Sequence, residues 1–175
     1  MQIEETALPG VLILTPARHG DARGFFSESW NRRTLEKAGV TLPEFVQDNH
    51  SLSARAGTLR GLHYQWPNPQ GKLVTVLQGE VWDVAVDIRR GSPTFGRWTA
   101  MVLNAENKRH FWIPEGFAHG FVVTRGPALF SYLCTETYDP AADANIAWND
   151  ADLAIDWPLA HPALSGKDAA APFLR

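Results

Sequence analysis

Short segments rich in β-branched and aromatic residues recur along most of this chain, and turn-forming residues separate them. After residue 70 these segments are GKLVTVLQG, EVWDVAVDI, WTAMVLN, HFWIPEG, HGFVVT and ALFSYLCTETY. Val, Ile, Tyr, Phe and Trp favour strands, whereas Gly and Pro between them favour turns. The 14 Gly and 12 Pro are scattered through the chain, as turns between short strands require. The spacing therefore predicts an all-β fold, either a sandwich or a barrel.

Other kinds of structure are expected only near the two ends. The segment VLILTP favours a strand, and the HGDARG that follows it favours a turn. WNRRTLEKAG is the best helix candidate, because its middle residues favour a helix and Gly39 suits the position just after the C-cap. The tail predicts irregular structure with one short helical turn, packed down by aromatic residues at Trp148, Trp157 and Phe173.

Length, charge and cysteine content narrow the class of protein. The 175 residues suit one domain with a substantial core, so we expect a single domain over residues 1–175. A net charge of -3 gives no basic field that would attract nucleic acid or a membrane. The single cysteine, Cys134, excludes an internal disulfide framework. No signal-peptide pattern or membrane-spanning run is visible, so we expect a cytoplasmic protein without nucleic-acid or membrane partners.

The segment TLRGLHYQ places His63 two residues after a glycine, in a stretch that is typical of a strand. A small β-barrel with histidines suggests a cupin, a fold that often holds a metal through H-x-H, a carboxylate and a later P-x-G-x-x-H. PEGFAH supplies the later part and ends at His119. The earlier part is broken, because Tyr64 and then Gln65 follow His63. Two imidazoles without a clustered third ligand make a poor metal site, so the sequence predicts no metal.

Several short segments contain polar or charged residues in patterns that suggest a binding site. FVQDNHS places four polar residues in a row over residues 47–50, which is costly unless they meet solvent or a ligand. DARGFFSESW surrounds Arg23 with glycine and phenylalanine, QGK places Lys72 at the start of a strand, and GKD places Lys167 beside Asp168. Each charge alone would ordinarily be a solvated surface residue, but together these stretches indicate a site.

Taken together, these segments resemble the dTDP-4-dehydrorhamnose 3,5-epimerase family. The resemblance runs from about residue 11 to residue 174 and rests on many separated blocks, among them GDARGFFSESW, FVQDNHS, LRGLHYQ, GEVWDVAVDIR, WIPEGFAHGF and LSGKDAAAP. It implies a cupin-type jelly-roll β-barrel that has lost its metal, with one short N-terminal helix and an irregular, partly helical C-terminal tail. It also implies a homodimer with exchanged N-terminal strands.

The resemblance implies an isomerase that uses no cofactor and acts on a dTDP-linked 4-keto-6-deoxy sugar, in dTDP-L-rhamnose biosynthesis. The ketone at C4 acidifies the C–H bonds at C3 and C5, so the enzyme needs a base, an opposed acid and a group that stabilises the enolate. By resemblance, His63 is the base and Asp168 its dyad partner. Tyr132 is the acid, and Lys72 lies near the ketone. An imidazole titrates near neutral pH and a phenol near pH 10, which suits these two roles.

The resemblance further implies the contacts with the nucleotide and the sugar. Basic contacts come from Arg23, Arg60 and Lys167, and aromatic ones from Phe26 and Tyr138, of which the tyrosine stacks on thymine. The polar contacts are Glu28, Gln47, Asn49, His119 and Asp143. Two positions depart from the common pattern of the family: Asp143 stands in place of Glu, and Leu133 in place of Lys. We expect neither departure to abolish the chemistry, although either could alter substrate choice.

Strand alternation adds two expectations. Asp83 could orient His119, but alternation places Asp83 on the face opposite to an apolar set, which favours its exposure to solvent; that apolar set is Trp82, Val84, Val86 and Ile88. Arg60 and His63 have opposite parity in a regular strand, so both reach one pocket only if the strand is irregular or if Arg60 acts at the mouth of the pocket. Gly61 between them would permit a β-bulge.

Three alternative functions stay open at this point. A C3-only or C5-only epimerase of another deoxysugar pathway would use the same residues. A non-catalytic jelly roll that binds a nucleotide sugar would be favoured by loss of His63, Tyr132 or Asp168, yet all three are present. A metal-dependent cupin oxygenase or isomerase would retain metal when purified without any added.

Overall fold

Two long antiparallel strands, β7 (Lys72–Asp87) and β10 (Phe117–Cys134), run through the middle of the computed structural model, which describes residues 1–174. They pair along their whole length, and the register shifts near Gly79 on β7 and between Val123 and Phe130 on β10. Each strand was predicted as two shorter strands separated by a turn. The turn residues instead lie within continuous strands, where they shift the register.

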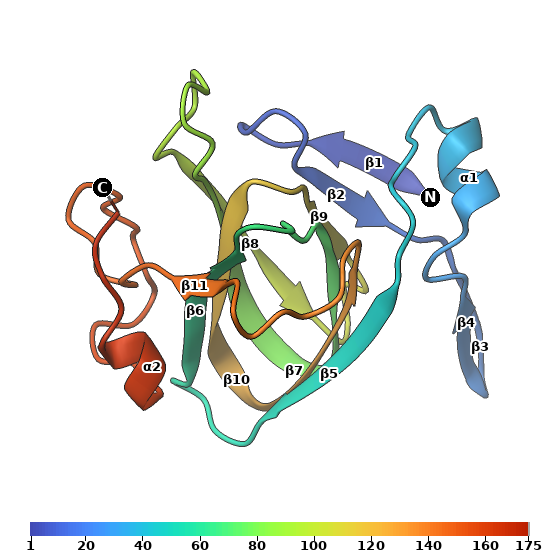
Figure 1. The fold of residues 1–175 in the computed structure, drawn as a ribbon. Helices are drawn as coiled ribbons and strands as arrows, with labels where there is room; N and C mark the ends of the chain where they lie inside the picture. Colours follow the sequence, from blue (N-terminus) through green and yellow to red (C-terminus); the bar gives the residue numbers. More distant parts are fainter. Residues whose placement is uncertain (175) are drawn as a thin grey trace.

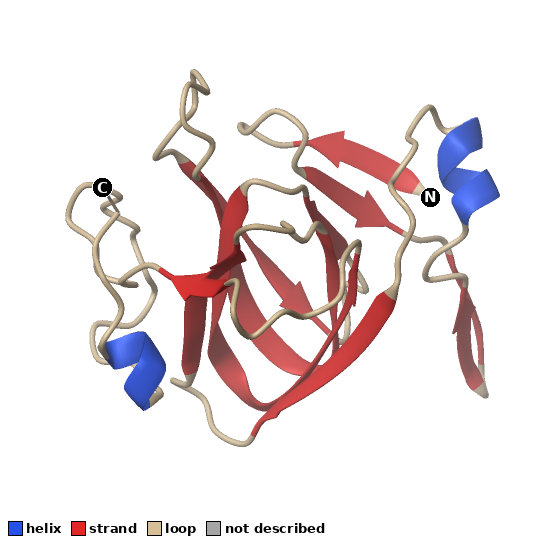
Figure 2. Ribbon diagram, viewed as in Figure 1, coloured by secondary structure: helices blue, strands red, loops and turns tan. Residues whose placement is uncertain are grey.

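The other strands of the main sheet pair with one half or the other of this central pair. On the first half the order is β1-β2-β9-β7-β10-β5, and on the second half it is β8-β7-β10-β6-β11. The sheet curls round into a barrel (Figures 1 and 2), so the predicted all-β jelly roll is confirmed. The bounds are β1 (Gln2–Glu5), β2 (Leu12–Thr15), β5 (Gln47–Ser53), β6 (Leu59–Gln65), β8 (Trp98–Asn104), β9 (His110–Ile113) and β11 (Asp143–Asn145).

A separate hairpin, β3 (Arg18–Asp21) and β4 (Gly24–Ser27), extends away from the barrel (Figure 1). The sequence predicted HGDARG as a turn, but only Ala22 and Arg23 lie between the two strands. Every residue of β3 is exposed, so its sequence lacks the alternation that usually marks a half-buried strand.

The predicted N-terminal helix is confirmed as α1 (Arg32–Lys37). Asn31 caps its start by accepting the Thr34 N–H, and Gly39 follows the C-cap with a φ of 85°. Leu35 packs this helix on the outer face of the first half of the sheet, against Leu73 and Trp112. Among the helices of residues 1–174, none is long and apolar enough to cross a membrane.

The C-terminal tail covers the outer face of the second half and contains the one-turn helix α2 (Gly166–Ala169). Trp157 packs edge-on against Trp82 of β7 and donates from its indole to the Trp148 carbonyl, as the prediction of a packed tail requires. For Phe173 the prediction was wrong, because its side chain is 62% exposed.

The predicted solvent-facing orientation of Asp83 is wrong, because the tail covers the opposite face of β7. Its side chain is fully buried and faces the barrel interior, on the same side of β7 as Val81 and Ala85. The opposite, apolar face of β7 is also buried, because tail residues that include Leu153 and Trp157 pack on it. Alternation correctly separated the two faces but could not show that both are covered.

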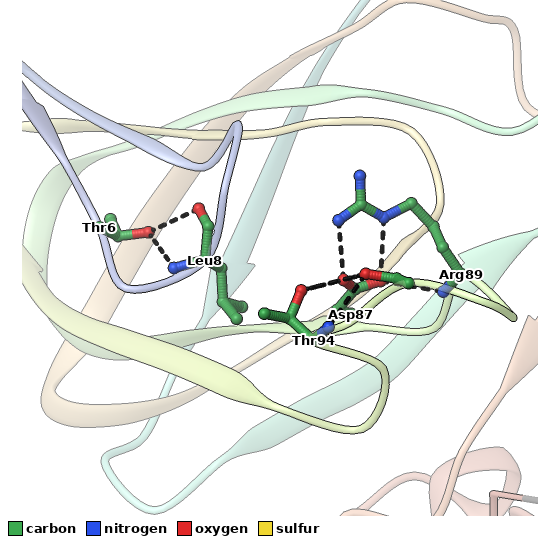
Figure 3. A network of polar contacts seen from close by, with 6 residues as sticks. Thr6, Leu8, Asp87, Arg89 and Thr94 are labelled. Carbon is green, nitrogen blue, oxygen red and sulfur yellow. Dashed lines mark hydrogen bonds and ion pairs between the residues drawn. The ribbon is translucent and has the colours of Figure 1, made fainter.

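At the end of β7, the buried Asp87 carboxylate collects a dense set of donors (Figure 3). Arg89 donates to both carboxylate oxygens, at 2.9 and 2.7 Å, and the hydroxyls of Ser92 and Thr94 donate at 2.7 and 2.6 Å. Burial acts to raise the pKa of this carboxyl, but these hydrogen bonds outweigh it and hold the pKa well below the ordinary value. The network fixes the loop that follows β7.

Candidate active site

A histidine and an aspartate from distant parts of the chain meet at the edge of the barrel. His63 lies on β6, and its Nε2 is 2.6 Å from Oδ1 of Asp168 in α2. Asp168 is 4% exposed, whereas the imidazole of His63 is 36% exposed and reaches a cavity. Burial acts to raise the pKa of Asp168, but hydrogen bonds from His63 and Ser165 and the nearby positive charge lower it overall. The carboxylate therefore stays ionised and can only accept from His63.

The cavity has a volume of about 320 Å³ and is mainly lined by polar side chains. Seven of the predicted site residues line it: His63, Lys72, Tyr132, Gln47, Asn49, Tyr138 and Asp143. The structure thus brings together residues of β5, β6, β7, β10, β11 and the loop that follows β10.

Lys72 is a buried ionisable group of this cavity, and Tyr132 is half-buried. The Lys72 side chain is 9% exposed, and burial lowers the pKa of its ammonium, against the attraction of Cys134 and Asp143. Among residues 1–174, no carboxylate lies within ion-pairing distance of this ammonium, so an anionic ligand would satisfy it. Burial also raises the pKa of Tyr132, which keeps the phenol protonated. Tyr132 packs beside Phe130.

Several other polar side chains of the cavity are joined to one another by hydrogen bonds. Gln47 donates to Asn49 at 2.9 Å and accepts from the backbone N–H of Tyr138 at 2.8 Å. The Tyr138 hydroxyl donates to Asp143 at 2.9 Å, and the Lys167 ammonium pairs with the same carboxylate oxygen at 2.5 Å. Asp143 therefore links the exposed Tyr138 ring to the segment that carries Asp168.

A second histidine–carboxylate pair lies beside the first. His119 on β10 is the register partner of His63, and its Nε2 lies 2.9 Å from the buried Asp83 carboxylate. Burial raises the pKa of Asp83, against the effect of His119. His119 stacks on Phe130 and is 8% exposed, and it is not one of the residues that line the cavity. Its predicted substrate contact stays a prediction, whereas its contact with Asp83 corrects the solvent-facing orientation that strand alternation favoured for that aspartate.

The predicted bulge at Gly61 is confirmed. His63 pairs with His119 and Arg60 with Phe121, so β6 has one residue more than β10 between these pairs. Gly61 has a φ of 124°, and a Cβ there would lie 2.6 Å from the Gly120 backbone, so no other residue fits without movement. Arg60 does not line the cavity, although its charge acts on Tyr132; its guanidinium donates to Ser53 on β5.

Three predicted site residues lie elsewhere. Arg23 is 90% exposed and pairs with Asp21 in the turn of the β3–β4 hairpin, and Phe26 is 69% exposed on β4. Glu28 accepts from Asn31 and Thr34 at the start of α1. None of the three lines the cavity within one chain.

Some site residues were not predicted from the sequence. Gln65 is 5% exposed, and its amide is saturated by backbone groups of Asn68, Thr137 and Asp139, so it anchors the loop that carries Tyr138. Gln70 and Tyr64 also line the cavity. Gln65 stands where an H-x-H motif would place its second ligand, and its amide is already occupied. Across residues 1–174, no three His, Cys, Asp or Glu side chains converge as a metal site would require.

The fold and the site together define a jelly-roll barrel of the cupin type, with several ionisable side chains around one polar cavity. The family model described as dTDP-4-dehydrorhamnose 3,5-epimerase matches residues 5–175, and the chain belongs to this family of isomerases.

Named relatives agree with this assignment. The dTDP-4-dehydrorhamnose 3,5-epimerase of Salmonella typhimurium is 54% identical, over 99% of this chain and 96% of its own. The crystal structure of dTDP-6-deoxy-D-glucose-3,5-epimerase from Legionella pneumophila, in complex with dTDP-4-keto-L-rhamnose, has a TM-score of 0.94 and 53% identity, over 99% of this chain and 92% of that one. The epimerase of Bacillus anthracis, with TDP and PPi bound, has a TM-score of 0.95 and 46% identity, over 99% of both chains.

Proposed function

We propose that this protein epimerises dTDP-4-dehydro-6-deoxy-D-glucose at both C3 and C5, giving dTDP-4-dehydro-L-rhamnose, in the cytoplasm. The observation that carries the proposal is the His63–Asp168 dyad, which faces the same small cavity as a protonated phenol and an unpaired ammonium. The names of close relatives and the sugar nucleotide bound in the Legionella structure support the choice of substrate.

The hydrogen bond to Asp168 supports Nδ1 of His63 as the atom that acts as the base. An ionised carboxylate only accepts, so Nε2 carries the proton and Nδ1 keeps its lone pair. In the first step the C–H bond at C3 or C5 breaks, the proton moves to Nδ1, and the electron pair moves to the C4 oxygen. Asp168 stabilises the imidazolium that forms.

Lys72 and Tyr132 suit the remaining two roles. The Lys72 ammonium would lie against the enolate oxygen, where a fixed positive charge in a closed site stabilises the developing anion. Tyr132 lies on the half of β10 that pairs with β5, whereas His63 lies on β6 in the other half. The two side chains therefore reach the cavity from different halves of the sheet, as an acid and a base on opposite faces of a sugar require. When the phenol donates its proton, the enolate collapses to the inverted ketone.

The open end of the cavity suits the nucleotide. Tyr138 is 54% exposed, so its ring can stack on a thymine base. The Lys167 ammonium beside it and the Arg60 guanidinium supply positive charge for a diphosphate, together with the amides of Gln47 and Asn49.

We also propose a homodimer in which the β3–β4 hairpin of a second copy completes this nucleotide site. The exposure of Arg23 and Phe26, outside the cavity of their own chain, supports this arrangement. An inactive His63→Ala chain mixed with an inactive Arg23→Ala chain should then recover part of the activity, because one of the two sites in a mixed dimer is intact. Absence of any recovery in verified mixed dimers would contradict the shared site.

The test of the chemistry is NMR of the 4-keto sugar nucleotide in deuterated water. Wild-type protein should exchange the protons at both C3 and C5. His63→Ala should bind dTDP but lose exchange by about a hundredfold to ten-thousandfold, the usual contribution of a positioned base. His161→Ala, which changes an exposed histidine of the tail, is the matched control and should exchange normally. Exchange at a single carbon by wild type would indicate a C3-only or C5-only epimerase, and undiminished exchange by His63→Ala would refute the proposed base.

A further inference from the structure

Ser165 makes two hydrogen bonds with the carboxylate residue of the dyad. Its Oγ accepts from the Asp168 backbone N–H at 3.1 Å, which caps the first turn of α2. The same hydroxyl donates to Asp168 Oδ2 at 2.9 Å. One hydroxyl has one hydrogen and two lone pairs, so it can make both bonds at once.

The second of these bonds divides the Asp168 carboxylate between two partners. Oδ1 faces His63 Nε2, and Oδ2 faces the Ser165 hydroxyl. With both oxygens engaged, rotation of the carboxylate about its terminal bond would break two hydrogen bonds in a nearly buried position. The orientation of the oxygen that contacts His63 is therefore set from behind by Ser165.

The bond also favours the ionised form of Asp168. Burial alone would raise the pKa of this carboxyl; hydrogen bonds from His63 and Ser165 lower it, and the charge of Lys167 lowers it further. A carboxylate that stays ionised is what keeps the proton on Nε2 of His63 and leaves Nδ1 free.

We propose that Ser165 is a positioning residue for the epimerisation: its hydroxyl orients the Asp168 carboxylate and thereby fixes the tautomer of His63. This role rests on the proposed function of the dyad and adds a third member behind it. The segment SGKD thus uses one aspartate both as the N3 residue of a helical turn and as the partner of the base.

A helix cap and a positioning residue can be separated, because they need different parts of the side chain. Ser165→Thr keeps the hydroxyl and both bonds. Ser165→Asp keeps an acceptor suited to the N-cap, but it replaces the donating hydroxyl with a second carboxylate, whose charge repels that of Asp168. Ser165→Ala loses both. Ser165 is exposed, so each of these side chains has room.

The experiment measures kcat, KM and the pH dependence of kcat/KM for the full-length variants, with thermal unfolding as a check of the fold. We expect Ser165→Ala to lower kcat about tenfold with little change in KM, since one charge-assisted hydrogen bond is lost. Ser165→Asp should lower kcat at least as much, and Ser165→Thr should stay within about twofold of wild type. In the alanine and aspartate variants the acidic limb of the pH profile should move, because the stabilisation of the charged imidazole has changed.

Normal kcat and an unchanged pH profile in Ser165→Asp would show that Ser165 is only a helix cap and would overturn the inference. A failure of the proposed function looks different, because His63→Ala would then exchange protons normally whatever the Ser165 variants do. An inactive His63→Ala together with a normal Ser165→Asp refutes the role of Ser165 alone.

Discussion

His63 and Asp168 lie 105 residues apart in the sequence, yet Nε2 of the first and Oδ1 of the second are separated by 2.6 Å. The tail reaches this position through contacts with the strand that carries His63 and with its neighbour. Leu59 and Ala163 share a backbone hydrogen bond, and Asn145 on β11 donates to the Lys167 carbonyl. The His63–Asp168 hydrogen bond therefore forms only when the tail packs on the barrel.

Tyr132→Phe should separate proton removal from inversion. The phenyl ring keeps the packing beside Phe130, but it cannot donate a proton to the new face of the sugar. His63 can still remove a proton and return one to the original side. Deuterium should then enter recovered substrate with retained configuration, while the inverted product falls sharply.

The measurement compares deuterium in recovered substrate and in product for wild type and Tyr132→Phe. A fall of both to background would mean that Tyr132 is needed to form the enolate, which contradicts its role as a separate acid. If neither falls, Tyr132 only packs, and His119 is the next candidate for the donor.

Prolonged chelation should leave activity unchanged, because the proposed steps use only side-chain groups. The position that would carry a second histidine ligand holds Gln65, whose amide is already occupied by backbone groups. The check is the rate after dialysis against a strong chelator, alongside a mock-dialysed sample. Loss of activity that one particular divalent ion restores would contradict this prediction.

Local patterns in the sequence predicted much of the barrel, because a strand that packs one apolar face has a period of two residues. The same pattern, through the parity conflict between Arg60 and His63, predicted the bulge at Gly61. Alternation could not orient Asp83, because the tail covers the face that would otherwise meet solvent. The β3–β4 hairpin was missed because its exposed residues carry no burial pattern.

Contacts between residues far apart in the sequence could not be predicted from local sequence patterns. Only the family resemblance connected Asp168 to His63, and nothing in the spacing of the two residues indicates their contact. Ser165 had one available signal, since serine three residues before an acidic residue is typical of a helix cap. The hydrogen bond from its hydroxyl to the carboxylate depends on the docked tail, which the sequence does not describe.

Lys72→Met should lower kcat by about a hundredfold while dTDP binding changes less, because a charge that stabilises the enolate is lost while the chain length is nearly kept. The pH profile gives a second readout. Burial lowers the pKa of Lys72 from its ordinary 10.5, so its charge is present below the shifted pKa and is lost as pH rises through it. Tyr132 has a raised pKa and stays protonated over this range.

The alkaline limb of the wild-type kcat/KM profile should therefore belong to Lys72 and disappear in Lys72→Met. Lys37→Met, at an exposed position of α1, is the control and should keep the limb. A variant of Lys72 with the wild-type alkaline limb would show that another group titrates there.

Asp87→Asn should destabilise the fold without touching the active site. The buried carboxylate accepts hydrogen bonds from Arg89, Ser92 and Thr94, and loss of its charge weakens several of these charge-assisted bonds, at a cost of about 2 kcal/mol.

The pKa of Asp87 is lower in the folded protein than in the unfolded chain, so the unfolded chain binds its proton first as pH falls. The stabilisation is then complete above the ordinary carboxyl pKa of about 4 and decreases as pH falls towards the folded value. Urea unfolding at pH 7 and pH 3 checks this: the difference between wild type and Asp87→Asn should be smaller at pH 3. Asp156→Asn, at an exposed site, should change stability little at either pH. An equal difference at both pH values would show that the carboxylate charge of Asp87 is not what stabilises this loop.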